Sequence, residues 1–322
     1  MTAETMVNNL LTEACTNRIS DIYFLPKKDT YVIEAKNSLT TYTVAELNYD
    51  ETFALMNYLK FNGGLDISER RRSQKGAFSY TFQNSRINVR ISSVGDFLNR
   101  ESLVIRLIYP QKKVSDSDID LVNYLLPYAR LKGMMIFSGP MGSGKTSLMY
   151  NLARIVGRNK KVMCIEDPIE IAEEDFLQLQ VNVEAGMTYE ELIKTSLRHR
   201  PELLIIGEVR DKQTAQQAVQ AALCGYTVFT TIHGKSKYSV VSRLKQLGVS
   251  SFEINNAVNL ISYQRLIPTN DKLEIFADFL NNQQIERYQA NDQRDSKWQS
   301  LLNNALQKRI ITNEIYDEYV AG

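Results

Sequence analysis

Gly139-Pro-Met-Gly-Ser-Gly-Lys145-Thr146 decides the fold of this 322-residue chain. The apolar run 134–138 precedes this stretch, and a helical pattern over 145–156 follows it. Glycines at this spacing let backbone N–H groups turn inward, and the first turn of a helix adds positive potential. A strand, a glycine-rich loop and a helix in this order are typical of a P-loop. The stretch therefore predicts binding of a nucleoside triphosphate.

The expected nucleotide-binding residues are the loop itself and the start of its helix. Lys145 is expected to reach the outer phosphates, and the hydroxyl of Thr146 is expected to ligate Mg²⁺. The full set is Gly139, Pro140, Met141, Gly142, Ser143, Gly144, Lys145, Thr146 and Ser147.

The composition is that of an ordinary globular protein: 43% of residues are apolar, 23% are charged, and the net charge is +1. Without a basic excess, direct binding of nucleic acid is not expected. No apolar run approaches the roughly 18 residues of a membrane span, and the start of the chain lacks a signal-peptide pattern. The scattered Cys15, Cys164 and Cys224 have no metal-binding spacing, so no structural zinc is expected. These features predict a cytoplasmic protein.

The order of patterns predicts an α/β protein with more than one domain. Residues 1–110 read as a mixed α/β domain, and 111–118, after Pro110, read as a linker rich in lysine, aspartate and serine. Over 119–268, helices alternate with apolar strands, which implies a largely parallel sheet. Residues 269–322 form a small C-terminal extension of strand and helix.

Individual elements are expected where apolar periodicity and capping residues coincide. Thr188 and Glu191 form a capping box for a helix that ends near His199, and Asp211 caps the helix 215–224. The predicted strands are 22–25, 30–33, 77–82, 87–91, 103–108, 134–138, 161–165, 176–181, 203–207, 227–232 and 273–277. Further helices are predicted around 10–15, 119–130 and 298–311.

Polar residues follow several strands of the predicted parallel sheet, at the ends where ligands bind in open α/β folds. Glu166 follows one strand, Glu208 another, and His233 a third. Hydrolysis of a nucleotide needs a ligand for Mg²⁺ and a group that activates water, and the two carboxylates are available for these tasks. His233 is suited to sense the γ-phosphate through a hydrogen bond. For Asp167 and Asp211, helix capping is an equally good interpretation.

The order of these motifs resembles the ATPases that drive type II secretion, type IV pili and related machines. The P-loop corresponds to the Walker A motif of that family, and three further segments are similar to its Asp box, Walker B and His box. These are Ile165-Glu-Asp-Pro-Ile-Glu170, Leu204-Ile-Ile-Gly-Glu-Val-Arg-Asp211 and Thr231-Ile-His233. Outside them, similar motifs are Ile19-Ser-Asp-Ile-Tyr-Phe-Leu-Pro26, Ile87-Asn-Val-Arg90-Ile-Ser, Val104-Ile-Arg106-Leu-Ile and Gln264-Arg-Leu266.

This resemblance implies a RecA-like ATPase domain over 119–268, preceded by a smaller PAS-like domain, with ATP and Mg²⁺ as ligands. It assigns Glu166 as the base that polarises the attacking water, and Glu208 as a holder of Mg²⁺. Arg90 and Arg106 would supply positive charge to the nucleotide from the N-terminal domain. The family also implies a homo-hexamer at the cytoplasmic face of the cell membrane, coupled to a polytopic membrane protein for pilus assembly.

Several residues depart from the family pattern. Tyr23 replaces a histidine, and Gly225-Tyr226 replaces Gly-His at the start of the His box, so only His233 remains of two histidines. A four-cysteine zinc element is absent from the sequence. Such a short, zinc-free chain is most similar to the ATPases of competence pseudopili in Gram-positive bacteria. Pilus retraction, type II secretion and a low-turnover nucleotide-binding regulator are the alternatives; a generic P-loop kinase lacks a lid-like arginine cluster.

Overall fold

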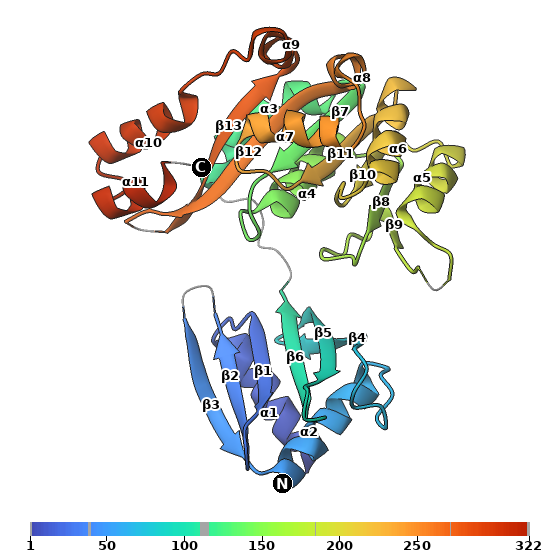
Figure 1. The fold of residues 1–322 in the computed structure, drawn as a ribbon, viewed down its shortest axis with the longest axis vertical. Helices are drawn as coiled ribbons and strands as arrows, with labels where there is room; N and C mark the ends of the chain where they lie inside the picture. Colours follow the sequence, from blue (N-terminus) through green and yellow to red (C-terminus); the bar gives the residue numbers. More distant parts are fainter. Residues whose placement is uncertain (1, 38–39, 110–115, 184, 271, 321–322) are drawn as a thin grey trace. The chain divides into compact units, whose positions relative to one another are not determined.

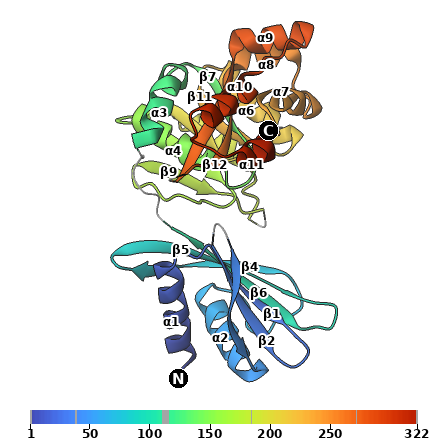
Figure 2. The same cartoon turned by 90° about the vertical axis from the view of Figure 1, so that its left-hand side faces the viewer.

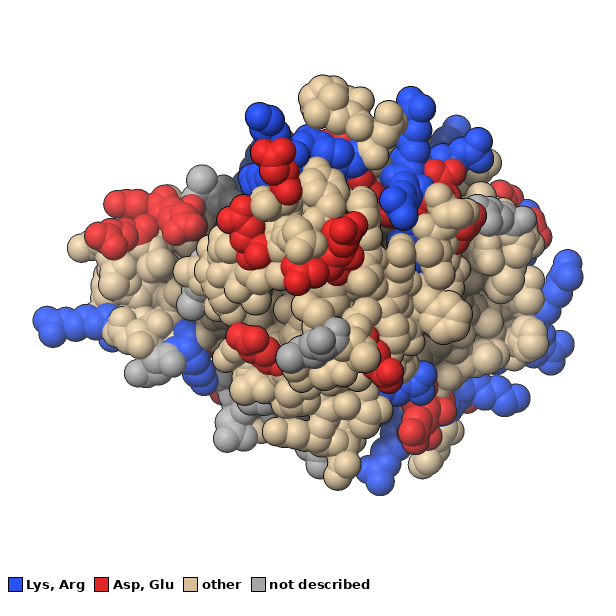
Figure 3. Space-filling model, turned by 90° about the horizontal axis from the view of Figure 1, so that it is seen from below, with Lys and Arg blue, Asp and Glu red and all other residues tan. Residues whose placement is uncertain are grey.

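The chain forms two compact units, Met1–Gln111 and Lys112–Gly322 (Figure 1). The computed structural model describes residues 2–37, 40–109, 116–183, 185–270 and 272–320. No helix among these residues has the length and apolar character needed to cross a membrane. Acidic and basic side chains share the face shown in Figure 3, in keeping with a net charge of +1.

The described part of the first unit is built on a six-stranded antiparallel sheet in the order β3-β2-β1-β6-β5-β4. The helices α1 and α2 lie side by side on one face of this sheet (Figure 2). The elements are α1 (Ala3–Thr16), β1 (Asp21–Pro26), β2 (Tyr31–Lys36), β3 (Thr41–Leu47), α2 (Tyr49–Asn62), β4 (Gln74–Phe82), β5 (Ser85–Gly95) and β6 (Glu101–Ile108).

Alternation along the strands decides which side chains of this sheet enter the core. In β5, Ile87, Val89 and Ile91 are buried with the apolar residues of α1 and α2. Because successive side chains of a strand point to opposite faces, Arg90 lies on the face that the two helices leave uncovered. The same alternation in β6 places Arg106 on that face.

The described residues of the second unit form a seven-stranded sheet in the order β13-β12-β7-β11-β10-β8-β9. Its strands run parallel except β13, which pairs antiparallel with β12 at the edge. The strands are β7 (Gly133–Ser138), β8 (Val162–Glu166), β9 (Phe176–Gln180), β10 (Leu203–Ile206), β11 (Thr227–Ile232), β12 (Val258–Pro268) and β13 (Leu273–Asn281).

Helices cover both faces of this sheet, which explains why its central strands are continuous apolar runs. In β7, Met135 and Phe137 pack with α3 and α4, whereas Met134 and Ile136 pack with the helices of the opposite face. The helices are α3 (Asp116–Ala129), α4 (Lys145–Val156), α5 (Tyr189–Arg198), α6 (Lys212–Leu223), α7 (Lys237–Gln246), α8 (Ser251–Ala257), α9 (Asn282–Asn291), α10 (Lys297–Gln307) and α11 (Asn313–Tyr319).

The α/β fold class predicted from the sequence is confirmed, and the predicted strands of the second unit correspond to β7 to β11 and β13. The predicted linker 111–118 lies outside the described residues up to 115. Its last residues, 116–118, belong to α3, which begins before the predicted 119. The predicted helix 298–311 is wrong in length, because α10 ends at Gln307 and α11 follows.

Candidate nucleotide site

The P-loop lies between a fully buried strand, β7, and the first turn of α4. Gly139, Gly142 and Gly144 have φ angles of 145°, 75° and 80°, which an L-residue rarely adopts. Gly144 is the N-cap of α4 and has no side chain with which to cap it. The first N–H groups of the helix are thus left for an anionic ligand, as a phosphate site requires.

Lys145 folds back over this loop. Its side chain is largely buried, and Nζ donates hydrogen bonds to the carbonyl oxygens of Gly139 at 3.0 Å and Pro140 at 2.7 Å. Burial lowers the pKa of the Lys145 ammonium, and the negative charges of Glu208 and Glu170 oppose this effect. An ammonium held only by carbonyl oxygens in a desolvated loop is suited to exchange them for the oxygens of a phosphate.

Gln264 on β12 holds the P-loop from the side, a role that the sequence analysis did not assign to it. Its Nε2 donates to the carbonyl oxygen of Ser143 at 2.9 Å, and the side chain is completely buried. The backbone of β12 lies so close to the loop that a Cβ on Gly139 would come within 2.2 Å of the Gln264 oxygen. The β12 strand therefore shapes the loop as directly as β7 does.

Glu166 ends β8 and is 4% exposed. Its Oε1 accepts a hydrogen bond from the hydroxyl of Tyr150, which lies on α4 and is itself buried. Burial is the main cause that raises the pKa of Tyr150, with the negative charge of Glu166 adding to it, so the phenol stays protonated and remains a donor. The structure thus links the predicted base to the helix that starts at the P-loop.

Glu208 lies just beyond the end of β10, beside the guanidinium of Arg210 and the imidazole of His233. It forms an ion pair with Arg210, and Nε2 of His233 lies 3.7 Å from its Oε2. Its charge also acts on Lys145 across the sheet edge. The structure therefore brings together the residues predicted after β10 and β11, and it adds Arg210 as a partner that the sequence analysis did not assign.

Backbone hydrogen bonds fix the strand ends relative to one another. The N–H of Gly207 donates to the oxygen of Ile165 at 2.8 Å, and the N–H of Val209 donates to the oxygen of Thr231 at 2.9 Å. The hydroxyl of Thr231 also donates to the oxygen of Gly207 at 2.7 Å. The segments that carry Glu166, Glu208 and His233 consequently form one connected edge.

The two aspartates with a possible capping role differ. Asp211 is the N-cap of α6, because its Oδ1 accepts from the N–H of Thr214 at 2.8 Å. Asp167 is followed by a non-helical segment that leads to β9, so it caps no helix among the described residues. Thr188 is the N-cap of α5 and accepts from the N–H of Glu191, which is one half of the predicted capping box, and His199 is the C-cap of the same helix.

Arg90 and Arg106 lie in the first unit and are direct cross-strand partners on β5 and β6. Nε of Arg106 donates to Oδ1 of the buried Asp21 at 2.8 Å, which holds the guanidinium in place at the sheet surface. The two positive charges thus form a pair on the uncovered face of the sheet. Their contribution to a nucleotide site remains a prediction.

Unsatisfied polar atoms lie buried around the P-loop. In the part of the chain that the structure describes, Oγ of Ser138, Oγ of Ser143 and Oε1 of Gln264 have no hydrogen-bond partner. Such atoms cost stability unless a ligand or water satisfies them, so their gathering at the loop fits a site for phosphate. Thr146 at the start of α4 and Glu208 supply oxygen atoms of the kind that Mg²⁺ prefers.

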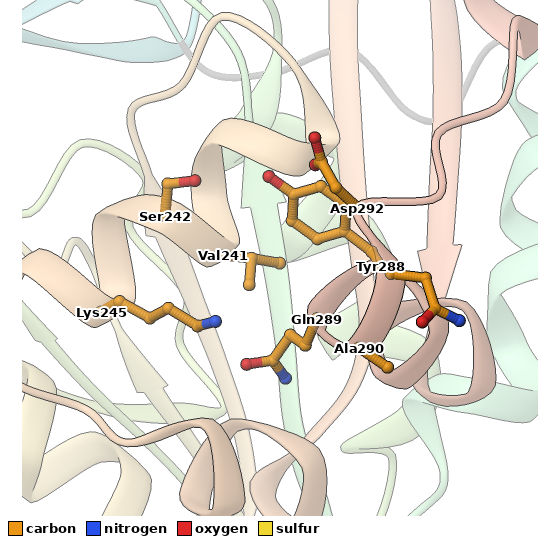
Figure 4. Close-up of a pocket in the computed structure, with 8 residues that line it drawn as sticks. Val241, Ser242, Lys245, Tyr288, Gln289, Ala290 and Asp292 are labelled. Atoms are coloured by element: carbon orange, nitrogen blue, oxygen red, sulfur yellow. The ribbon is translucent and has the colours of Figure 1, made fainter.

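A pocket of about 550 Å³ between α7 and α9 shares no residue with the P-loop or the strand ends (Figure 4). Val241 and Lys245 line it from α7, and Tyr288 and Gln289 line it from α9. None of the predicted site residues lies there. Elsewhere in the described residues, no cluster of three or more His, Cys, Asp or Glu side chains is suited to hold a metal ion.

Comparison with known proteins gives one consistent family. The family described as Type II/IV secretion system protein matches residues 1–317. Competence protein ComGA of Streptococcus pneumoniae is 40% identical over 293 residues, which cover 91% of this chain and 90% of that protein. Competence protein ComGA of Bacillus subtilis is 34% identical, over 82% of this chain and 76% of that protein. The Type IV pilus assembly ATPase PilB of Acinetobacter baylyi is 31% identical, over 81% of this chain and 46% of its own length.

Solved structures confirm the fold. The ATPase DotB of Legionella pneumophila superposes with a TM-score of 0.80 at 20% identity, and covers 100% of this chain and 96% of its own. The pilus retraction motor PilT, solved with bound ADP, superposes with a TM-score of 0.70 at 18% identity, over 96% of this chain and 95% of its own. The predicted fold, a RecA-like domain that follows a smaller N-terminal domain in the chain, is therefore confirmed.

Proposed function

This chain belongs to the type II/IV secretion system protein family and is an ATPase, and we propose that it drives assembly of a competence pseudopilus for DNA uptake. The names of its relatives support competence. Three competence proteins are 40%, 34% and 30% identical and are covered over 90%, 76% and 89% of their length, whereas the pilus assembly ATPase is 31% identical and is covered over 46%. One observation carries the mechanism: a P-loop lysine and two strand-end carboxylates share one edge of the sheet.

Binding is the first step of the proposed mechanism. The glycine-shaped loop and the first N–H groups of α4 wrap the phosphates of ATP, and the Lys145 ammonium moves from the loop carbonyls to the outer phosphates. Thr146 and Glu208 would hold Mg²⁺, which neutralises charge on the phosphates. Ser147 and the other loop residues would surround the same phosphates.

Hydrolysis is assigned to the carboxylate at the end of β8. Glu166 accepts a proton from water while the water oxygen bonds to the γ-phosphorus, and the bond from that phosphorus to the bridging oxygen breaks. The products are ADP and inorganic phosphate. His233, beside Glu208, reports the state of the γ-phosphate through a hydrogen bond, and Arg90 and Arg106 supply positive charge from the first unit.

The work of the cycle requires partners. We propose a homo-hexamer at the cytoplasmic face of the cell membrane, coupled to a polytopic pilus-assembly protein, without direct contact to nucleic acid. A change of angle between the two units would transmit each hydrolysis step. The alternatives are pilus retraction, type II secretion and a low-turnover regulator. They predict different effects in cells when ATP hydrolysis is lost.

The test is Glu166→Gln, which keeps the shape of the side chain and removes the proton acceptor. Hydrolysis is expected to fall by about 10²–10⁴-fold, with nucleotide binding retained, and pseudopilus assembly and DNA uptake should stop in cells. The matched control is Glu174→Gln, at an exposed carboxylate on the segment before β9, which should leave both activities intact. Assembly that continues without hydrolysis would rule out the motor and leave the regulator.

A further inference from the structure

The hydroxyl of Tyr150 is a buried polar group that the proposed mechanism does not use. The tyrosine is fully buried on α4, five positions after Lys145 in the same helix. Its hydroxyl donates to Oε1 of Glu166, on β8. An apolar ring would serve packing alone, whereas this hydroxyl is hydrogen-bonded to a residue assigned to hydrolysis.

A second hydrogen bond fixes this hydroxyl from the other side. Nε2 of Gln178 on β9 donates to the Tyr150 oxygen at 3.0 Å and to the carbonyl oxygen of Ile171 at 2.7 Å. Oε1 of Gln178 accepts from the N–H of Glu173 at 2.8 Å. The amide of Gln178 is thus oriented by two backbone groups. Because its N–H is directed at the tyrosine oxygen, the phenolic proton points away from Gln178, and Oε1 of Glu166 accepts it.

We propose that Tyr150 is the positioning residue of the hydrolytic base: its hydroxyl, oriented by Gln178, holds Oε1 of Glu166 and so sets the orientation of the carboxylate toward the attacking water. This inference rests on the proposed role of Glu166. It extends that role by linking the base, at the end of β8, to the helix that begins at the P-loop.

The geometry explains why such a link is useful. A carboxylate that accepts a proton must be held close to its optimal position, because a misplacement of about 1 Å can cost about 10²-fold in rate. Lys145 and Tyr150 lie on one rigid helix, so the phosphate-binding residues and the base keep a fixed separation. A hydrogen bond from a neutral donor also stabilises the charged carboxylate, which is desolvated at 4% exposure.

A purely structural role predicts something different. The ring of Tyr150 packs near Phe176 at 6.1 Å between centroids, and phenylalanine would fill the same space. If packing were the only function, removal of the hydroxyl would change stability and leave the catalytic rate alone. If the hydroxyl positions Glu166, its removal lowers kcat instead and leaves KM for ATP unchanged.

The experiment uses the full chain and the variants Tyr150→Phe, Glu166→Gln and the double variant. Tyr150→Phe is expected to lower kcat by about 10- to 100-fold, with KM and the affinity for a fluorescent ATP analogue unchanged. Because the hydroxyl acts through Glu166, the double variant should hydrolyse ATP no more slowly than Glu166→Gln alone. The matched control is Tyr49→Phe, which removes a hydroxyl bonded to the carbonyl of Lys27 at 2.9 Å in the first unit and should keep wild-type kcat.

Two results would overturn the proposal: wild-type kcat in Tyr150→Phe, or a loss that adds in full to that of Glu166→Gln. If Tyr150→Phe does not fold, the variant Gln178→Leu tests the proposal in its place. It keeps the Tyr150 hydroxyl but removes the amide that orients it. A lower kcat at unchanged KM supports the proposal there, and wild-type kcat refutes it. Failure of the base assignment itself is recognised separately, by full turnover of Glu166→Gln.

Discussion

Gly139 shows, at the scale of one residue, how a neighbouring strand shapes the P-loop. Its φ of 145° lies outside the range that L-residues readily adopt. A Cβ at this position would lie 2.2 Å from the carbonyl oxygen of Gln264 and 2.6 Å from Oγ of Ser143. Both the backbone angle and the close approach of β12 therefore require glycine.

Gly139→Ala is expected to destabilise the protein by about 2–5 kcal/mol, the sum of a left-handed backbone and an overpacked contact. It should also weaken ATP binding, because the loop must move away from β12. The control is Gly225→Ala, with a φ of 87° and open space around its Cβ, which carries only the backbone cost of about 1–2 kcal/mol. Urea unfolding and titration with a fluorescent ATP analogue measure both effects. Equal losses in the two variants would contradict the close-contact argument.

The residues that sequence reasoning found differ physically from those it missed. Lys145 belongs to a local motif, and Glu166 follows an apolar run, so both have a signal within a few positions. Tyr150 has no such signal, and Gln264, although it belongs to the motif Gln264-Arg-Leu266, has none for its contact with the P-loop. The partner of Tyr150 lies 16 positions away and that of Gln264 lies 121 positions away, and only the folded sheet brings them together.

At the scale of elements, the β12–β13 hairpin connects the nucleotide site with the C-terminal helices. Gln264 on β12 holds the P-loop, while its neighbour Tyr263 points to the opposite side and contacts Trp298 on α10. The rings of Tyr263 and Trp298 meet edge to face, 5.2 Å apart, and Nε1 of Trp298 donates to the oxygen of Tyr319 at the end of α11. Trp298 is thus the anchor of both helices.

Trp298→Ala should destabilise α10 and α11 by about 3–5 kcal/mol, because it removes a buried aromatic side chain and leaves a cavity. Hydrogen exchange is expected to rise in α10 and α11 and to stay low in β7 and α4, which lie in a separate core cluster. Trp298→Phe keeps most of the packing and loses the bond to Tyr319, so its cost should be near 1 kcal/mol. If protection from hydrogen exchange fell equally throughout the second unit, α10 and α11 would unfold together with the rest of that unit and not separately.

Elements were predictable where their burial left a clear pattern. The strands β7, β8, β10 and β11 are buried at every position and read as apolar runs. No such pattern marks β3, whose exposed and partly buried residues do not alternate. The polar residues of β12 interrupt its apolar pattern as well, since Ser262 and Gln264 are both buried and Gln264 is hydrogen-bonded to the P-loop.

At the scale of the whole molecule, the residues assigned to the reaction are divided between two units. Lys145, Glu166 and Glu208 belong to the second unit, whereas Arg90 and Arg106 belong to the first. Arg106 is held by Asp21, and its removal would leave a buried carboxylate without its guanidinium partner. Arg90 is therefore the better probe of whether charge from the first unit reaches the nucleotide.

Arg90→Ala is expected to lower kcat by about 10²-fold or more, since a positive charge at the developing transition state is commonly worth that much. Binding of ATP should persist, because the P-loop and α4 lie within the other unit. The matched control is Arg86→Ala on the same strand, an exposed arginine whose Nε donates to Oγ of Ser79 at 2.8 Å, and it should hydrolyse ATP at the wild-type rate. Steady-state hydrolysis and fluorescent ATP titration separate the two quantities. Equal kcat in both variants would confine the reaction to the second unit, and the first unit would then act only in transmitting its result.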